Sequence, residues 1–138
     1  MEPFQVNILE TDAPFFEGKC ESLIVPTLDG ALGILAHHSN VIAAIIPGSL
    51  YYKPVDGEMQ EAAVSEGLVE VENGRALVLV NTAERPEEID DNRVRRAIEE
   101  AEDALLRKSS IQEYRMAEAN LNRALNRLRV KGHSTQRK

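Results

Sequence analysis

The sequence contains no tryptophan, a single cysteine and no long apolar run. Because aromatic residues make up only 4% of its 138 residues, any hydrophobic core has to be aliphatic. Cys20 cannot form a disulfide within the chain, which is typical of a reducing compartment. The longest unbroken apolar run is Val41–Ile46. A bilayer span needs about 20 apolar residues, so we expect no membrane-crossing helix, and the N-terminal residues show no targeting signal.

Charge is distributed unevenly along the chain. The whole chain has a net charge of −7, but residues 1–85 alone carry −9 and residues 104–138 carry +7. The acidic first part and the basic C-terminal end therefore have opposite electrostatic character. A basic end favours an acidic partner without identifying it as a nucleic acid, a phosphate or a protein surface.

Residues before Pro86 show the two-residue period of β-strands. Alternating apolar positions at residues 4–8, continuous apolar runs, and two hairpin signals at Asp56-Gly57 and Asn73-Gly74 all favour strands. Both central residues of such two-residue turns need positive φ angles. Pro54 lacks a backbone N–H, which favours an edge position for its strand. No helical period interrupts this part, so we predict an antiparallel β-sandwich or barrel over residues 1–85.

Residues after Pro86 change to a helical period. Two apolar stripes with spacings of three and four residues predict two amphipathic helices: Val94, Ile98, Ala101 and Leu105, then Tyr114, Ala117, Leu121, Ala124 and Leu128. Ser110 and Glu113 form a capping-box pattern that starts the second helix, and Gly132 is expected to end it. We predict an α+β fold in which a two-helix antiparallel hairpin, within residues 86–138, follows the β-domain. Its alanine-rich seam predicts a marginally stable, mobile hairpin.

An arginine stripe on the second helix is the most informative charged feature. At 100° per residue, Arg115, Arg123, Arg127 and Arg129 lie almost opposite the apolar stripe. The stripe is either an ordinary solvated face or a docking face for carboxylates or phosphates, which suit the planar guanidinium group.

Other chemical motifs are weak. His37 and His38 are adjacent, but neighbouring side chains on an extended chain point to opposite sides, and no third ligand follows. We therefore expect no metal site. There is no phosphate-binding loop and no nucleophile-elbow pattern, and Cys20 is interpreted as a core residue.

The order of these features resembles one family. An acidic β-domain, an alanine-rich helical hairpin and a basic second helix are similar to the epsilon subunits of bacterial F-type ATP synthases. The resemblance covers residues 3–131 and rests on four motifs taken together: Asp29–His38, Pro47–Gly48, Val64–Val71 and Ala117–Leu128. Two positions depart from the family. Ala36 stands where proline is usual, and Ala31 stands where some relatives carry an acid that contacts the membrane ring.

The resemblance implies a non-catalytic rotor subunit. The β-domain would bind the gamma subunit and contact the c-ring through a loop that includes Asp29, Ala31 and His38. The hairpin would fold back or extend toward the alpha and beta subunits. There Arg115, Arg123 and Arg127 would meet acidic beta-subunit segments and inhibit ATP hydrolysis. The implied location is the cytoplasmic face of the cell membrane, as a peripheral part of the complex, with no nucleic-acid partner.

The resemblance also implies a regulatory ATP site, although no cofactor is required. Some relatives bind ATP at positions that correspond to a set of five residues here: Glu84, Asp90, Arg93, Arg123 and Arg127. Val94 replaces an alanine of their motif and Glu100 replaces an arginine, so we expect weaker ATP binding. The alternative for Asp90 is a helix N-cap, with Arg93 a surface residue. For the whole chain, the alternatives are a free-standing, non-enzymatic adaptor module and an independent nucleotide hydrolase, although the sequence shows no catalytic base or magnesium motif.

Overall fold

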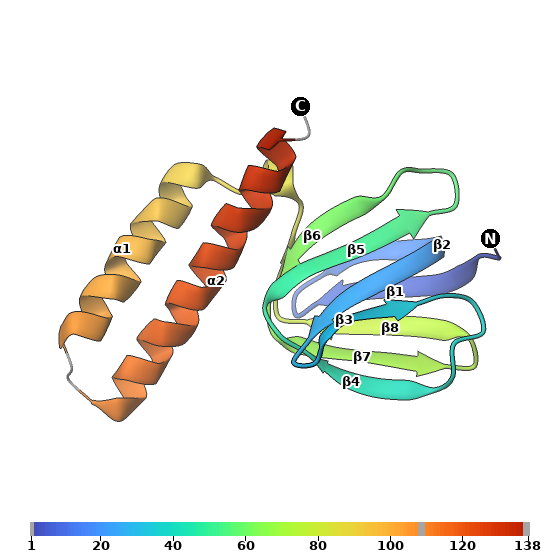
Figure 1. Ribbon diagram of the computed structural model, residues 1–138, viewed down its shortest axis with the longest axis horizontal. Coiled ribbons are helices and arrows are strands. Elements are labelled where there is room, and N and C mark those ends of the chain that lie inside the picture. The colour runs from blue at the N-terminus through green and yellow to red at the C-terminus, as the bar shows by residue number, and fades with distance from the viewer. Residues whose placement is uncertain (1, 108–109, 137–138) are drawn as a thin grey trace. The chain divides into compact units, whose positions relative to one another are not determined.

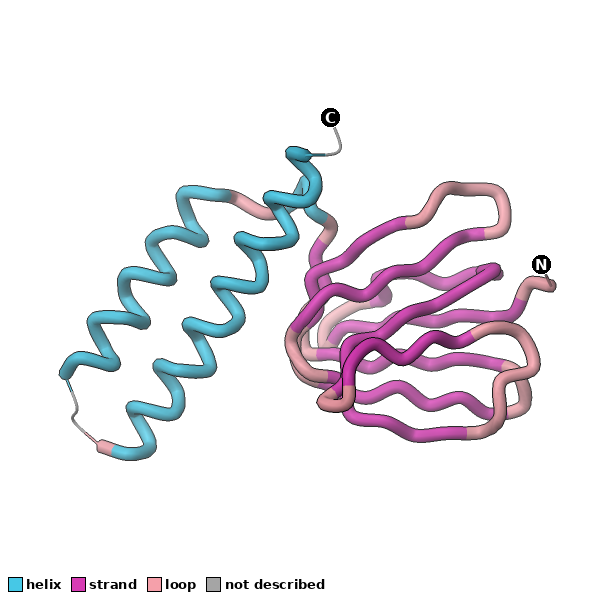
Figure 2. Tube along the Cα trace, in the orientation of Figure 1, coloured by secondary structure: helices cyan, strands magenta, loops and turns pink. Residues whose placement is uncertain are grey.

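The computed structural model describes residues 2–107 and 110–136 and divides the chain into two compact units between Glu84 and Arg85. In the described residues, strands occupy the first unit and helices the second (Figure 2). The predicted fold class, a β-sandwich followed by two helices, is confirmed.

The first unit contains nine strands in its described residues. They are β1 (Phe4–Glu10), β2 (Pro14–Thr27), β3 (Gly30–Ile34), β4 (Val41–Ile45), β5 (Gly48–Pro54), β6 (Gln60–Val64), β7 (Gly67–Glu72), β8 (Arg75–Val80) and β9 (Ala83–Glu84). Their order is β4-β7-β8-β1-β2-β5-β6-β9, and β3 pairs with β2 (Figure 1).

The long strand β2 connects the two layers of the sandwich. Its first part pairs with β1, and its last part pairs with β3, where Leu23 lies opposite Ile34. The register of β2 against β5 shifts between Cys20 and Ser22. A bulge bends a strand and increases its twist, so this irregularity lets one strand take part in both layers.

One strand pairing differs from the antiparallel pattern that we predicted. Strands β1 and β8 run parallel, with Val6 opposite Ala76 and Glu10 opposite Val80. Alternation within a strand determines which side chains face the core, but it does not encode the direction of a neighbour that is distant in sequence. The N-terminal strand is placed between β2 and β8, and only the first of these pairings is a local hairpin.

The two predicted hairpin turns differ in the structure. Asn73 and Gly74 have φ angles of 53° and 76° and join β7 to β8 in the predicted two-residue turn. The interpretation of Asp56-Gly57 as another such turn was wrong, because neither residue has a positive φ angle. Residues 55–59 form a longer loop that starts with a turn in which the Gly57 N–H donates to the Pro54 carbonyl.

The predicted edge position of Pro54 was also wrong. Its strand β5 lies between β2 and β6. Pro54 is the last residue of β5 and lies beyond the last β6 pair, between Tyr52 and Gln60. Its missing N–H therefore removes no hydrogen bond from that ladder.

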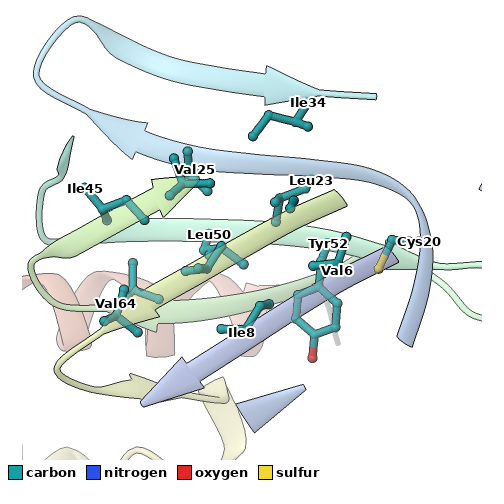
Figure 3. Close-up of a cluster of buried hydrophobic side chains, with 14 of the residues drawn as sticks. Val6, Ile8, Cys20, Leu23, Val25, Ile34, Ile45, Leu50, Tyr52 and Val64 are labelled. Carbon is teal, nitrogen blue, oxygen red and sulfur yellow. The ribbon is translucent and has the colours of Figure 1, made fainter. Parts of the chain in front are cut away.

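The core of the sandwich is aliphatic, as expected from the scarcity of aromatic residues. Side chains from β1 to β6 converge between the layers, including Ile8, Leu23 and Leu50 (Figure 3). Each fully buried Val, Leu or Ile contributes about 1.5–3 kcal/mol. Cys20 is fully buried, which confirms its structural role, and burial raises the pKa of its thiol to about 11.

The second unit consists of the short 3-10 helix η1 (Pro86–Glu88), helix α1 (Asp91–Arg107) and helix α2 (Ile111–Gln136). The Ser110 hydroxyl accepts a hydrogen bond from the Glu113 N–H at 3.1 Å, which confirms Ser110 as the N-cap of α2. Gly132 does not end α2. Its φ angle is not positive, so it lacks the left-handed conformation by which glycine ends helices. None of the described helices is long and apolar enough to span a bilayer.

Candidate functional site

The fully buried side chains in the seam of the helical hairpin are small. Val94 and Ala101 of α1 are buried, and so are Ala117 and Ala124 of α2. The prediction that Tyr114 belongs to this seam was wrong, because its side chain is 45% exposed. Alanine contributes little apolar area, so these buried positions stabilise the hairpin less than leucine or isoleucine would.

The base of the hairpin is held by η1. Pro86 of η1 is buried, and α2 packs against this short helix. The Lys131 ammonium group donates to the Pro86 carbonyl at 3.3 Å. These contacts tie the C-terminal part of α2 to the segment that precedes α1.

The first pair of candidate nucleotide ligands lies at the start of α1. Asp90 Oδ1 accepts backbone N–H groups from Asn92 at 3.0 Å and from Arg93 at 3.3 Å. Asp90 is therefore the N-cap of α1, as the alternative interpretation stated. Arg93 is exposed in the first turn of the same helix.

The second pair lies on α2. Arg123 and Arg127 are half-buried and one helical turn apart. An Arg123 N–H donates to Asn120 Oδ1 at 2.8 Å, which fixes that guanidinium along the helix. Arg115, two turns earlier than Arg123, is exposed. The three predicted inhibitory arginines thus differ in environment: the first is solvated and the other two are partly covered.

Glu84 belongs to the sandwich, on the short strand β9. It lies opposite Ala63 of β6. Glu61 lies two residues earlier on β6, so both carboxylates belong to one face of the sheet. Glu61 is only 3% exposed, and one of its carboxylate oxygens accepts the hydroxyls of Ser49 at 2.8 Å and Tyr51 at 3.2 Å. Sequence reasoning missed this buried carboxylate, because a single Glu in an alternating strand looks solvated.

The residues expected in the c-ring loop are not brought together. Asp29 and Ala31 lie in and beside the turn between β2 and β3, next to Leu28, which is 83% exposed. The Asp29 N–H donates to the Thr27 hydroxyl at 3.3 Å. His38 lies in the loop that follows the other end of β3 (Figure 1). Only the first two residues therefore share one exposed turn.

The adjacent histidines have separate partners. His37 Nε2 lies 2.7 Å from a carboxylate oxygen of Glu2, whereas His38 Nδ1 lies 2.7 Å from the Ser39 carbonyl. Among the residues that the structure describes, no group of three or more His, Cys, Asp or Glu side chains could hold a metal ion.

An apolar row crosses the outer face of the sandwich, and we did not predict it. Ala44, Leu68, Leu79 and Leu9 lie opposite one another on β4, β7, β8 and β1. Leu68 is 41% exposed and Leu79 39%, and Ile42, in the neighbouring row, is 70% exposed. We call these five residues the outer row. The continuous apolar runs in β4 and β8 could have indicated this row, because strands that are apolar on both faces are usually covered on both faces.

An acidic pair borders the outer row. Glu70 and Glu72 of β7 line a cavity of about 450 Å³ together with Asn73, Arg75 and Leu77. A hydrogen bond with the Glu72 side chain raises the pKa of Glu70, helped by desolvation and by the neighbouring negative charge. Arg75 lies opposite Glu72 across the strands.

Comparisons with known proteins agree across both units. Residues 3–86 match the beta-sandwich domain of the ATP synthase Delta/Epsilon chain, and residues 87–132 match its long alpha-helix domain. The ATP synthase epsilon chain of Caldicellulosiruptor bescii is 40% identical over 130 residues, which cover 94% of each chain. The epsilon chain of Shouchella clausii is 37% identical over 133 residues, covering 96% of this chain and 98% of the relative.

Solved structures show the same fold. A chain of the Euglena gracilis mitochondrial ATP synthase, solved as OSCP/F1/c-ring, superposes with a TM-score of 0.75 at 21% identity. The match covers 87% of this chain and 76% of that one. A chain of the Tetrahymena thermophila ATP synthase central stalk and c-ring gives a TM-score of 0.60 at 14% identity, covering 92% of this chain and 95% of that one. With both domain models matched in order and close relatives over nearly the whole length, the chain belongs to the ATP synthase Delta/Epsilon family.

Proposed function

We propose that this chain is the epsilon subunit in the central stalk of a bacterial F-type ATP synthase. It is a non-catalytic subunit that couples proton flow to ATP synthesis and lies, as a peripheral part of the complex, at the cytoplasmic face of the cell membrane. The observation that carries the proposal is the match of both domain models, in order, over residues 3–132. Relatives named epsilon chain align with this chain over almost their whole length.

The outer row is the proposed contact with the gamma subunit. Five exposed or half-buried apolar side chains on one face of the sheet form an apolar surface of the kind that marks protein interfaces. The bordering acids Glu70 and Glu72 make the rim of this surface polar. The turn between β2 and β3, with Asp29 and Ala31, is the proposed contact with the c-ring.

The hairpin is the proposed regulator of ATP hydrolysis. Its alanine seam is weak enough for a partner to shift it between a folded and an extended arrangement, because a small differential affinity moves such an equilibrium. In the extended arrangement, Arg115, Arg123 and Arg127 bind acidic segments of the beta subunits.

ATP is the proposed ligand that favours the folded hairpin. The residues proposed to bind ATP are the set that the family resemblance implies: Glu84, Asp90, Arg93, Arg123 and Arg127. Arg123 and Arg127 cannot bind ATP and beta-subunit carboxylates at once, so the two partners compete. ATP near its dissociation constant stabilises the folded arrangement by only about 0.4 kcal/mol.

Co-purification of the tagged full-length chain tests the assignment. We expect it to bring down the gamma, alpha and beta subunits. A Leu68→Glu variant should lose gamma, because a carboxylate then occupies the middle of the outer row. Met59→Glu is the matched control, since both side chains are 41% exposed but Met59 lies in the loop after β5. Failure of the unmodified chain to retain gamma would contradict the proposal.

A further inference from the structure

The seam side of α2 ends in a lysine. Ala117, Ala124, Leu128 and Lys131 follow one another at spacings of seven, four and three residues. At 3.6 residues per turn, these four side chains fall within an arc of about 60° on the helix. An apolar residue is usual at such a position, because the stripe faces the neighbouring helix. Lys131 is half-buried there, so its ammonium group needs polar partners.

One partner of this ammonium group is the carbonyl oxygen of Pro86 in η1. Lys131 Nζ donates to it at 3.3 Å, and the Ile89 backbone N–H donates to the same oxygen at 3.2 Å. A carbonyl oxygen has two lone pairs, so it can accept both donors. Pro86 and Ile89 are buried, which limits competition from water for this oxygen.

The short helix η1 presents this carbonyl in a fixed direction. Proline restricts its own φ angle to about −65°. The Glu88 N–H donates to the Arg85 carbonyl at 3.0 Å, and the side chains of the same two residues form an ion pair at 3.1 Å. Lys131 therefore meets a preformed acceptor, and the conformational entropy that the contact costs is mainly that of the lysine side chain.

The hydrogen bond between Lys131 and Pro86 requires a closed hairpin. The two residues are 45 positions apart in the sequence, and they meet because α2 returns along α1. With the two helices end to end, the same residues would lie roughly 60 Å apart, at 1.5 Å per residue. Any arrangement in which α2 leaves α1 therefore breaks this hydrogen bond and returns the ammonium group to water.

We propose that the hydrogen bond from Lys131 to the Pro86 carbonyl is a latch that keeps the hairpin closed and so limits how often the extended, inhibitory arrangement forms. The inference rests on the proposed regulation of ATP hydrolysis and names a residue that sets its balance. Loss of the latch destabilises the closed arrangement alone, so it shifts the population toward the extended one. Inhibition should then become stronger, whereas general damage to α2 would make it weaker.

Hydrogen exchange on the free full-length chain tests the latch itself. Lys131→Ala should speed exchange of the Glu88 and Ile89 amides about fivefold, because η1 then opens more often. Lys131→Arg should keep the original protection, since a guanidinium group also donates to a carbonyl. Lys19→Ala is the matched control, because it removes the same charge from an exposed position of β2. Unchanged exchange in Lys131→Ala, or equally fast exchange in Lys131→Arg, would overturn the proposal.

ATP hydrolysis by the reconstituted complex tests the regulatory consequence. Lys131→Ala should raise the ratio of extended to closed hairpin about fivefold and lower hydrolysis, while Lys131→Arg and Lys19→Ala should match the unmodified chain. A chain that ends at Glu84 gives the uninhibited rate.

The two possible failures are distinguishable. If the unmodified chain inhibits no more than the shortened one, the proposed function is wrong, and hydrogen exchange on the free chain still decides whether the latch exists. If the unmodified chain inhibits but Lys131→Ala inhibits equally or less, the proposed function stands and the inference about the latch is overturned.

Discussion

Asp90 and Arg93 are joined by a hydrogen bond from the Arg93 backbone N–H to Asp90 Oδ1, at 3.3 Å. The interaction that links these two residues of the proposed nucleotide site is therefore a helix cap. The cap fixes where α1 starts and hence where the Arg93 side chain projects. Any test of Asp90 in ATP binding has to separate this structural role from a direct one.

Comparing alanine with asparagine at Asp90 separates capping from direct ATP binding. Asp90→Ala should lower the free energy of unfolding of the helical unit by about 1 kcal/mol, because the cap is lost. Asp90→Asn keeps the cap and removes only the charge. If Asp90 binds the ligand directly, calorimetry with ATP should show weaker binding for Asn at unchanged stability. ATP affinity that is normal in the Asn variant and reduced only in the Ala variant would assign Asp90 to capping alone.

The arginines of α2 should carry inhibition of ATP hydrolysis. Changing Arg115, Arg123 and Arg127 together to alanine should raise hydrolysis by the assembled enzyme, because each charge-assisted hydrogen bond contributes about 1.5–3 kcal/mol. The matched control removes three exposed arginines of α1, Arg95, Arg96 and Arg107, and should leave hydrolysis unchanged. Equal effects of the two triple variants would indicate a general charge effect instead.

Gly67 should tolerate no side chain. A Cβ at this position would lie 1.9 Å from the Leu79 carbonyl oxygen and 2.7 Å from the Val80 Cα atom. Both are backbone atoms, so Gly67→Ala should lower the free energy of unfolding by about 1–3 kcal/mol or more, by overpacking. Gly33→Ala is the control, because no atom lies within 4 Å of its Cβ position. Urea denaturation of both variants gives the comparison, and equal midpoints would contradict it.

The acidic pair at the outer row should make stability depend on pH. The pKa of Glu70 is raised by the Glu72 side chain, so ionising Glu70 opposes folding. Its favourable contribution is present below the ordinary pKa of 4.5 and lost as pH rises through the raised value. Glu70→Gln should therefore have a higher urea midpoint than the unmodified chain at neutral pH, and the difference between the two midpoints should shrink at acidic pH. A difference that grows on acidification would contradict this pH dependence.

Local signals predicted those features that depend on a few neighbouring residues. Asn73-Gly74 gave a two-residue turn because both residues tolerate positive φ. Ser110 gave the start of α2 because its hydroxyl accepts an orphan N–H of the first turn. The two-residue period before Pro86 and the helical period after it likewise predicted strands followed by helices, since burial on one face imposes the period directly.

Features that depend on distant partners escaped prediction. The internal position of Pro54 follows from the pairing of β5 with β2, and the parallel pairing of β1 depends on a strand about 70 residues later. Tyr114 fits the apolar period of α2 but lies beside the seam, because small alanines determine which face packs. The outer row required the strand order, which places Leu68 and Leu79 opposite each other.

Removal of the hairpin tests the account most directly. A chain that ends at Glu84 keeps every described strand, the outer row and the turn with Asp29. In the reconstituted ATP synthase we expect this variant to retain gamma binding and ATP synthesis while ATP hydrolysis rises, because only the proposed regulator is absent. Loss of gamma binding, or hydrolysis that stays at the level of the full-length chain, would contradict the proposal that the sandwich binds gamma and the hairpin inhibits hydrolysis.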